Sequence, residues 1–480
     1  MASSKTVERC GIIMNYGVTI TGGVCPWQIF QQKDGTSDIS VNGAYTLIQL
    51  SQELPLQFSQ VGLRKVTIKA RIARESSGEA VLPWQLCSVL EDGRWETVFK
   101  NVPAGGLYRI ETYMDYDGWD GLSVTRGDMV HNVGVGDIFV IAGQSNAAGR
   151  SKNPVEDPPE LGVHLLRSSG RWELATHPLG ETTGAVHTGH FENHNPGHCP
   201  YLHFSKILKR ELGYPIGLVQ CAYGGSPLRW WNPEENGALF DNMMEMLGEY
   251  AIVPKGVLWY QGEAEGFEES ASTYLERFAA FAGHVRRALN SPELPFITVQ
   301  LNRCMTPSSD KLDREWGMVR EAQRRAAHEI KGVYTVPSSD VALYDFIHNS
   351  SEGDLVIGER CAKAALTEIY GRHYDWHAPE AIKAVRISED SLSLELDPIR
   401  NWINPFDVPP EFLPFTAEDE DGLIEVKEYR LEGRFILITF MHSFKDGAVL
   451  HGGWRMNPGP AIPFDCMRLP MLSFYGLPVK

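Results

Sequence analysis

A serine lies three residues after the first compact apolar run in the middle of this chain. The run, residues 137–142, is predicted to be a buried strand, and Gly143, Gln144 and Ser145 come next. A serine beside a glycine at the end of a strand can present its hydroxyl to a substrate, and the amides that open a following helix can bind an anion. The alternative is a Gly-Ser turn that caps a helix. The G-x-S-x-G elbow of α/β-hydrolases does not fit, because Ala147 occupies the second glycine position.

Glycines and polar residues follow two further apolar runs. Gly224 and Gly225 come after the second run and allow a ligand to approach the backbone closely, although they also suit any tight turn. Gln261 and Glu263 follow the third run. Polar side chains in such a place must be solvated, paired or turned into a cleft.

An aspartate precedes a histidine by three residues after the fifth run. Asp345 can reach Nδ1 of His348 when both lie on one loop or first helical turn, as the orientation of a catalytic histidine requires. Open α/β sheets hold their sites at the carboxyl ends of the strands. We therefore expect Ser145, the glycine pair, Gln261 and this Asp–His pair to meet at one edge of one sheet.

Strands and helices alternate in the middle of the chain and would position these residues. The predicted strands are residues 138–142, 216–222, 256–260, 296–301 and 333–336. The predicted helices are residues 201–212, 274–289, 315–330 and 355–370. This alternation indicates a parallel sheet with helices on both faces.

The two flanks of this middle part show the alternation of half-buried strands. The clearest runs are residues 66–72, 107–112, 384–387, 391–396 and 435–440, and residues 418–421 are a predicted turn. The sequence therefore predicts three domains. They are an N-terminal β domain (1–135), an α/β domain (136–378) and a C-terminal β domain (379–480).

Charge and composition exclude several classes of protein. The 480 residues carry a formal net charge of −17, which argues against a nucleic-acid binder and against an electrostatic anchor on an anionic membrane. No run approaches the ~20 apolar residues that span a bilayer. Glu8 and Arg9 interrupt the start where a signal peptide would be apolar, so we expect a cytoplasmic protein. The eight cysteines form no CxxC pair, which argues against a thiolate metal site.

Several blocks along the chain carry the residues of a known hydrolase family. They are Gly136–Phe139 with Gly143–Asn146, Pro215–Leu218 with Gly224–Ser226 and Trp230, Trp259–Glu263, Arg320–Gln323, and Ile347–His348 with Gly358–Arg360. In the flanks, Trp95 with Ala104–Tyr108 and the segment Gly453–Pro458 match as well. From about residue 60 onward, the chain resembles the sialate O-acetylesterase-like branch of the SGNH (GDSL-type) hydrolases. The resemblance implies an α/β fold, an SGNH-type three-layer α/β/α hydrolase domain with a parallel sheet between N- and C-terminal β domains.

The resemblance also implies roles for individual residues. Ser145 would be the nucleophile, His348 the general base and Asp345 the carboxylate that orients the base. The oxyanion hole would consist of the backbone amide of Ser145, a backbone amide of Gly225 or Gly224, and the side-chain amide of Gln261. The serine mechanism requires no cofactor and no metal.

Two positions depart from the family pattern. Ala147 stands where the family usually has methionine after the GQSN block. Asn349 stands where proline usually follows the catalytic histidine, within a longer loop, residues 349–353. The second departure bears on the Asp–His geometry, so Asp340 is the alternative third member of the triad.

Three other chemistries compete with the serine mechanism. A glycosidase could use Glu263 and Glu265, although its carboxyl groups must flank a bond about 5–9.5 Å apart. A metal hydrolase could use a loop rich in histidine, although the loop lacks a helical scaffold, and a loop over the cleft that contacts a sugar is the alternative. The residues of that loop are His187, His190, His194 and His198, with Glu192. A non-catalytic sugar-binding protein should have lost a triad member, and here all three are present.

The substrate is expected to be an acetylated carbohydrate. The resemblance suggests O-acetyl sialic acid, and acetylated xylan or mannan is the alternative. The substrate-binding candidates are Trp230, Trp231, Glu263 and Arg229, where the two tryptophans could stack on a sugar or pack in the core. A sialate carboxylate needs a cation, for which Arg229 and Arg303 are the candidates. The flanking β domains would shape the cleft or fix the geometry of a homo-oligomer.

Overall fold

The computed structural model describes residues 17–46, 66–118, 121–186, 190–192, 196–268, 270–405, 408–459 and 461–480. The chain divides into two compact units, Met1–Val135 and Gly136–Lys480. The separation of residues 379–480 as a third domain stays a prediction. Among the described residues, no helix combines the length and the apolar composition needed to cross a bilayer.

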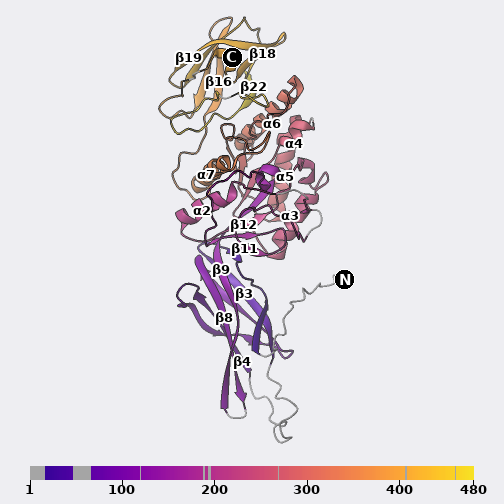
Figure 1. The fold of residues 1–480 in the computed structure, drawn as a ribbon, viewed down its shortest axis with the longest axis vertical. Coiled ribbons are helices and arrows are strands. Elements are labelled where there is room, and N and C mark those ends of the chain that lie inside the picture. The colour runs from indigo at the N-terminus through magenta and orange to yellow at the C-terminus, as the bar shows by residue number, and fades with distance from the viewer. Residues whose placement is uncertain are drawn as a thin grey trace. The chain divides into compact units, whose positions relative to one another are not determined.

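The first unit is built from β-strands alone within its described residues (Figure 1). One sheet has the order β1-β3-β7-β6, where β1 is Gly17–Gly22, β3 Thr36–Thr46, β6 Ser88–Val89 and β7 Arg94–Pro103. The other joins β4 (Val66–Arg74), β5 (Ala80–Leu86), β8 (Gly105–Gly118) and the first part of β9 (Gly121–Gly143), against which β2 (Ile29–Gln31) also pairs. Alternate residues of both sheets, such as Ile39, Val41, Ile68 and Ile72, are buried in one core, as period-two patterning requires.

The second unit contains the predicted parallel sheet. The parallel order is β10-β12-β9-β13-β14-β15, with β11 antiparallel at the edge. These strands are the last part of β9, β10 (Val163–Leu166), β11 (Trp172–Leu174), β12 (Ile216–Gln220), β13 (Gly256–Tyr260), β14 (Phe296–Val299) and β15 (Val333–Val336). All five predicted strands are present. Sequence patterning missed β10 and β11, because both are short and lie in a stretch rich in turn residues.

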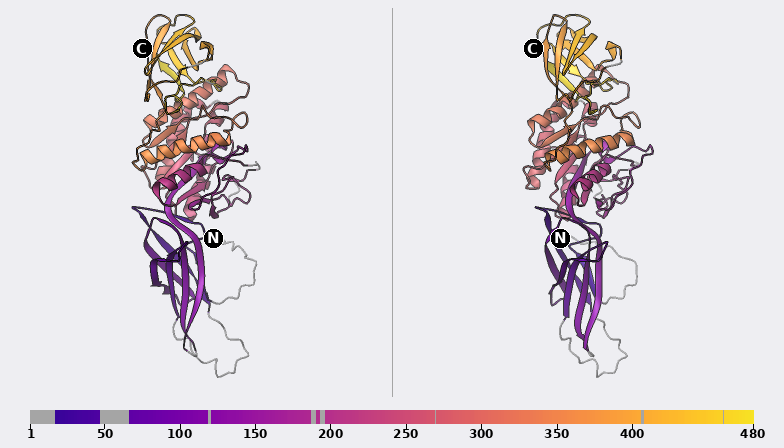
Figure 2. Two further views of the ribbon diagram at one scale, coloured as in Figure 1. Left: turned by 60° about the vertical axis from the view of Figure 1, so that its left-hand side comes forward. Right: turned by 90° about the vertical axis from the view of Figure 1, so that its left-hand side faces the viewer.

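Helices cover both faces of this sheet (Figures 1 and 2). On one side, α2 (Tyr201–Leu212) packs against α7 (Ser351–Glu368); on the other, α5 (Tyr274–Ala288) packs against α6 (Asp310–Glu329). The remaining helices are α1 (Ser145–Ala148), α3 (Ala238–Glu249), α4 (Glu263–Phe267) and the short 3-10 turns η3 (Leu228–Trp230) and η4 (Ala271–Thr273). These layers are the three-layer α/β/α arrangement that the sequence predicted.

Side-chain caps decide where two helices begin, and both begin earlier than predicted. Ser309 Oγ accepts a hydrogen bond from Leu312 N at 3.3 Å, and α6 begins at the next residue, Asp310. Ser350 Oγ accepts one from Gly353 N at 3.1 Å, and α7 begins at Ser351. The predicted loop of residues 349–353 is therefore mostly the capped first turn of a helix.

The C-terminal strands form a seven-stranded antiparallel sheet in the order β16-β17-β20-β19-β18-β21-β22. They are β16 (Glu380–Arg386), β17 (Ser391–Asp397), β18 (Phe415–Asp419), β19 (Gly422–Glu432), β20 (Phe435–Phe440), β21 (Val449–Gly452) and β22 (Phe474–Pro478), with the turn η5 (Pro410–Phe412) before β18. All three predicted strand runs lie in this sheet, and β18 and β19 meet at the predicted turn. A core of its own is formed by buried residues such as Leu394, Ile436, Ile438 and Phe440.

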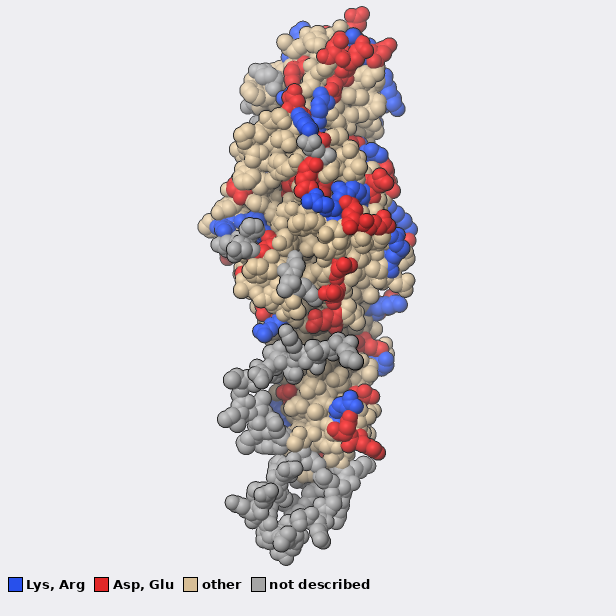
Figure 3. All heavy atoms as spheres, turned by 90° about the vertical axis from the view of Figure 1, so that its right-hand side faces the viewer, with Lys and Arg blue, Asp and Glu red and all other residues tan. Residues whose placement is uncertain are grey.

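A fully buried arginine ties this sheet to the α/β layers. Arg320 on α6 donates from Nη1 to the carbonyls of Gly453 and Arg455 at 2.9 and 2.7 Å, and from Nη2 to Asn302 O at 2.8 Å. Burial lowers the pKa of its guanidinium to about 9. Two blocks of the family pattern, Arg320–Gln323 and Gly453–Pro458, thus meet in one contact. On the face in Figure 3, acidic and basic side chains of the α/β layers are interspersed.

Candidate active site

Ser145 lies at the end of the central strand because a glycine permits the turn before it. Gly143 has φ 121°, and a Cβ there would lie 2.1 Å from Tyr260 O on β13. Ser145 is the first residue of α1 and is 8% exposed. Gln144 holds the turn, because its Oε1 accepts hydrogen bonds from Gly262 N at 3.2 Å and Ala264 N at 3.3 Å. The serine therefore sits on a backbone tied to two neighbouring segments.

One cavity of about 640 Å³ lies beside this serine. Its lining includes most of the residues that the sequence singled out, together with two cations and several apolar side chains. These residues are Gln144, Ser145, Arg150, Lys152, Gly224, Gly225, Glu263, Ala264, Phe267, Glu268, Tyr344, Asp345, Phe346, Ile347 and His348. The structure thus brings together the ends of β9, β12 and β13 and the loop after β15.

The Asp345–His348 pair has the geometry that its spacing predicts. Asp345 Oδ2 lies 2.7 Å from His348 Nδ1. The other oxygen, Oδ1, accepts hydrogen bonds from the backbone amides of Ile347 at 2.9 Å and His348 at 2.8 Å. Partial burial acts to raise the pKa of Asp345, but these hydrogen bonds outweigh it and hold the pKa below its ordinary value. The carboxylate is ionised at neutral pH and fixes the imidazole.

The alternative carboxylate, Asp340, is committed elsewhere. Its two oxygens each accept a hydrogen bond of 2.7 Å from the guanidinium of Arg360 on α7. Asn349, which replaces the family proline, uses the amide that proline lacks: its N–H donates to Asn146 Oδ1 at 3.1 Å. This bond ties the histidine loop to the residue after Ser145, so the departure from the family pattern adds a contact between the two loops.

The two glycines after β12 differ in what their amides can do. Gly224 N donates to Glu192 Oε1 at 2.8 Å and is occupied. Gly225 has φ 64°, is exposed, and lines the cavity with an amide that has no hydrogen-bond acceptor among the described residues. Of the two glycines that the sequence left open, Gly225 is the one with an amide available to an oxyanion.

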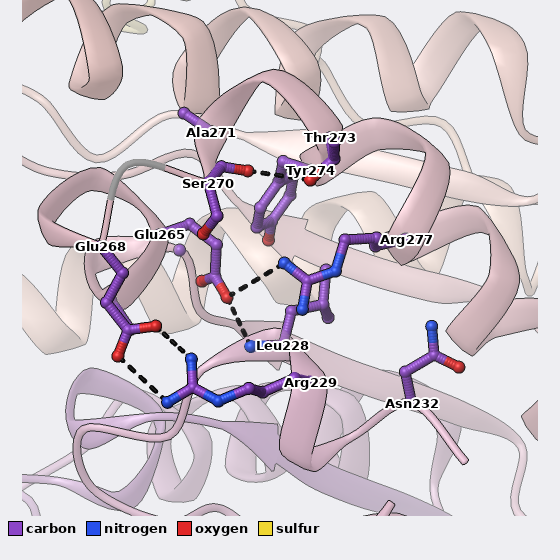
Figure 4. A network of polar contacts seen from close by, with 12 residues as sticks. Leu228, Arg229, Asn232, Glu265, Glu268, Ser270, Ala271, Thr273, Tyr274 and Arg277 are labelled. Atoms are coloured by element: carbon purple, nitrogen blue, oxygen red, sulfur yellow. Dashed lines mark hydrogen bonds and ion pairs between the residues drawn. The ribbon is translucent and has the colours of Figure 1, made fainter. Parts of the chain in front are cut away.

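Gln261 does not reach the cavity, contrary to the role expected for it. Its side chain is fully buried, and its Nε2 donates to Ser226 O at 3.2 Å and to the Glu265 carboxylate. Glu265 also accepts from Leu228 N at 2.5 Å and lies 3.9 Å from Arg277 (Figure 4). A buried carboxylate requires such donors, so Gln261 serves Glu265 and supplies no oxyanion donor.

Glu263 lines the cavity and is almost fully buried. Its Oε1 accepts from Asn146 Nδ2 at 2.7 Å, and its Oε2 is buried without a hydrogen-bond partner among the described residues. Burial raises the pKa of Glu263 to about 7, and burial likewise raises that of Glu265. Because Glu265 is absent from the cavity lining, the predicted glycosidase pair Glu263 and Glu265 does not meet in this cavity.

Two of the expected sugar-binding residues belong to the core or to surface ion pairs. Trp231 is fully buried against Trp259 and Phe281, with ring centroids 5.3 and 5.9 Å apart, and so cannot stack on a substrate. Arg229 pairs with Glu268 (Figure 4) and does not line the cavity. Trp230 is half-buried and meets Tyr223 edge-on at 5.9 Å, also outside the cavity lining.

Two cationic residues that the sequence patterns did not indicate line the cavity instead of Trp231 and Arg229. Arg150 and Lys152 follow Ser145 by a few residues and line the cavity. Arg150 pairs with Glu192 at 2.5 Å, whereas Lys152 is exposed. Arg303, the other expected cation, donates to Val341 O at 3.2 Å and is not part of the lining. No motif marks Arg150 or Lys152; only their closeness to Ser145 in the chain could have indicated them.

The histidine-rich loop does not gather into one metal site. His190 hydrogen-bonds to Ala222 O at 3.2 Å, Glu192 pairs with Arg150, and His198 contacts Asp157 and Asp354. His187 and His194 lie outside the described residues. The described part of the loop is thus divided among three separate contacts.

Ser145 after the central strand and the Asp345–His348 pair after the last parallel strand thus lie beside one cavity of a three-layer α/β/α unit, the arrangement expected for the SGNH type. Residues 135–367 match the family model described as carbohydrate esterase, sialic acid-specific acetylesterase. This match confirms the family resemblance predicted from the sequence, and carbohydrate esterases are carboxylic-ester hydrolases.

Individual proteins are similar to parts or most of this chain. The chain is 24% identical over 237 residues to a sialate O-acetylesterase of Pongo abelii, and the match spans 42% of this chain and 43% of that relative. The fold is similar to that of a carbohydrate acetylesterase from Xanthomonas citri, with TM-score 0.65 and 20% identity over 95% of this chain and 99% of that one. A protein of Arabidopsis thaliana is 28% identical over 48% of this chain and 98% of its own, with TM-score 0.41.

Proposed function

We propose that this chain is a carbohydrate O-acetylesterase that uses Ser145, His348 and Asp345 through an acetyl-enzyme. The observation that carries the proposal is that these three residues line one cavity, with Asp345 2.7 Å from the Nδ1 of His348. The match of residues 135–367 to a carbohydrate esterase family supports the same class of reaction.

The proposed mechanism begins with proton transfer to the histidine. Because Nδ1 of His348 donates to Asp345, Nε2 is the nitrogen left to accept the Ser145 proton as Oγ attacks the acetyl carbonyl. The amides of Ser145 and Gly225 stabilise the oxyanion, each by about 2.7–4 kcal/mol. His348 then protonates the leaving sugar hydroxyl. Water, activated by the same histidine, releases acetate and restores Ser145.

We further propose that the substrate is an O-acetylated acidic sugar such as sialic acid. Lys152 and Arg150 line the cavity, and a substrate carboxylate gains a charge-assisted hydrogen bond from such a group. Because Arg150 is paired with Glu192, Lys152 is the cation available to the substrate. A neutral acetylated xylan or mannan would make no use of this charge, and it is the alternative that the experiment separates.

The test is acetate release from four substrates by the wild type and Ser145→Ala. The substrates are p-nitrophenyl acetate, 9-O-acetyl sialic acid, acetylated xylan and acetylated mannan. We expect Ser145→Ala to lose about 10³-fold or more on every accepted substrate, and Ser443→Ala, which changes an exposed serine, to match the wild type. An alanine variant as active as the wild type would refute the nucleophile. Preference for xylan would refute the acidic sugar and keep the serine mechanism.

A further inference from the structure

Three side chains that the serine mechanism does not use form a compact cluster beneath the loops around α1 and α2. Asp157, His177 and His198 each offer one ligand atom, and all three atoms lie within 4.8 Å of one another. Asp157 Oδ2 lies 2.9 Å from His177 Nε2 and 3.2 Å from His198 Nε2. The side chain of Asp157 is 1% exposed, that of His198 7% and that of His177 17%.

The spacing of these atoms fits a tetrahedral transition metal. Nitrogen and oxygen ligands about 2.1 Å from zinc lie about 3.4 Å apart in a tetrahedral site. The separations of Asp157 Oδ2 from the two histidine nitrogens, 2.9 and 3.2 Å, are slightly shorter, as expected for hydrogen-bonded atoms. Two imidazoles and one carboxylate are donors that zinc accepts, with a fourth position left for water.

A second carboxylate, that of Asp354, orients the ring of His198 through its other nitrogen. His198 Nδ1 lies 3.1 Å from Asp354 Oδ2, and Ser151 Oγ donates to the same oxygen at 3.0 Å. Such a carboxylate–histidine–metal arrangement fixes the ring and makes it a better ligand. Without a metal, both ring nitrogens of His198 face carboxylates.

We propose that Asp157, His177 and His198 form a binding site for Zn²⁺ or a similar divalent transition metal, distinct from the catalytic cavity. None of the three lines that cavity. Through Asp354, whose Oδ1 accepts from Asn349 Nδ2 at 3.3 Å, the site is linked to the residue that follows His348. The ion would therefore have a structural role: it would clamp two loops to the start of α7.

The ammonium group of Lys206 would repel a bound ion, and its removal provides a test of the site. Lys206 Nζ lies 2.5 Å from Asp157 Oδ1 and 2.9 Å from Pro158 O. An ammonium group this close weakens the binding of a divalent cation by repulsion. We expect Lys206→Met to bind the metal several-fold more tightly than the wild type, a direction that general loss of structure would not produce.

The experiment measures metal binding on the full chain after removal of bound metal with a chelator. Zn²⁺ titration by calorimetry and Co²⁺ titration by visible absorption are made on the wild type, His177→Asn, Lys206→Met and, as a matched control, the exposed His328→Asn. We expect one ion per chain for the wild type and the control, with Co²⁺ bands of tetrahedral coordination. His177→Asn should lose affinity by about 100-fold or more.

Each other result would overturn the proposal. No binding by wild type, or equal binding by wild type and His177→Asn, would make the cluster a metal-free network of ion pairs. Circular dichroism shows whether each variant is folded. These readouts do not depend on catalysis, so a failure of the esterase proposal and a failure of the metal site are separate outcomes.

Discussion

At one edge of the sheet, two sets of turns carry polar residues. The residues of one set line the cavity, and those of the other are buried. The turn after β9 and the loop after β15 bring Ser145 and the Asp345–His348 pair to the cavity. The turn after β13 carries Gln261 and Glu265 into a buried network with Leu228 N and Arg277 (Figure 4). All lie at the carboxyl ends of strands of one parallel sheet.

The difference lies in how many hydrogen-bonding atoms remain unused. Burial of Glu265 is costly unless donors surround it, and Gln261 is one of those donors. Asp345, in contrast, is satisfied by His348 and two backbone amides, and His348 keeps Nε2 for chemistry. A polar residue at a strand end is thus available for catalysis only when no buried charge nearby needs it.

The largest expected effect is on kcat, and it should distinguish Asp345 from Asp340. Asp345→Asn removes the acceptor that fixes the His348 tautomer, and we expect kcat for acetate release to fall by about 10⁴-fold. The matched control is Asp340→Asn, which breaks the pair with Arg360. It should lower thermal stability and leave kcat within about threefold. Equal losses in kcat would mean that Asp340 belongs to the triad.

Burial of Glu263 should make the free energy of unfolding depend on pH. The pKa of Glu263 is about 7 in the folded chain and 4.5 ordinarily, so its protonated form favours folding below pH 4.5 and this stability is lost as the pH rises through 7. Glu263→Gln imitates the protonated form. We expect a gain in unfolding free energy on the order of 2–3 kcal/mol at pH 8 and little change at pH 4.5, measured by urea unfolding.

The control for this measurement is Glu276→Gln, an exposed acid on α5. Its difference from the wild type should not vary with pH. A Glu263→Gln curve parallel to that of the wild type would mean that the pKa of Glu263 is not raised on folding, which would contradict this prediction.

A third variant tests whether the side chain of Gln261 stabilises the fold or donates a hydrogen bond to the oxyanion. Gln261→Leu leaves Glu265 short of one donor, and we expect a loss of about 1–3 kcal/mol in unfolding free energy. We expect kcat to change by less than about tenfold. Loss of an oxyanion donor would cost about 10²–10³-fold in kcat with little effect on stability, so that opposite result would return Gln261 to the site.

The smallest expected effect concerns the substrate. Lys152→Met removes the exposed cation of the cavity, and we expect kcat/KM for 9-O-acetyl sialic acid to fall by about tenfold, or about 1.4 kcal/mol. Activity on p-nitrophenyl acetate should stay unchanged. Arg229→Met, which alters a cation paired with Glu268 outside the cavity lining, should have no more than about a twofold effect on either substrate. The reverse ranking would point to Arg229 as the sialate partner.

Much of the fold could be predicted because periodicity is a local property. The five predicted strands of the hydrolase sheet and the three predicted C-terminal strand runs are all present. β10, with only four residues, and α3 were missed, because short or weakly bounded segments give little periodic signal. The starts of α6 and α7 were placed too late, because Ser309 and Ser350 cap them and their first turns are polar.

The sequence by itself indicated the catalytic candidates, because a serine after a strand and an Asp three residues before a His are local patterns, and the motif blocks along the chain carried the family resemblance. Only the tertiary structure decided which strand-end residues face the cavity. Gln261 and Trp231 carry the right chemistry but are buried by their neighbours, whereas Arg150 and Lys152 carry no motif and line the cavity. The physical reason is that burial and hydrogen-bond partners depend on residues distant in the chain, such as Glu265 for Gln261 and Glu192 for Arg150.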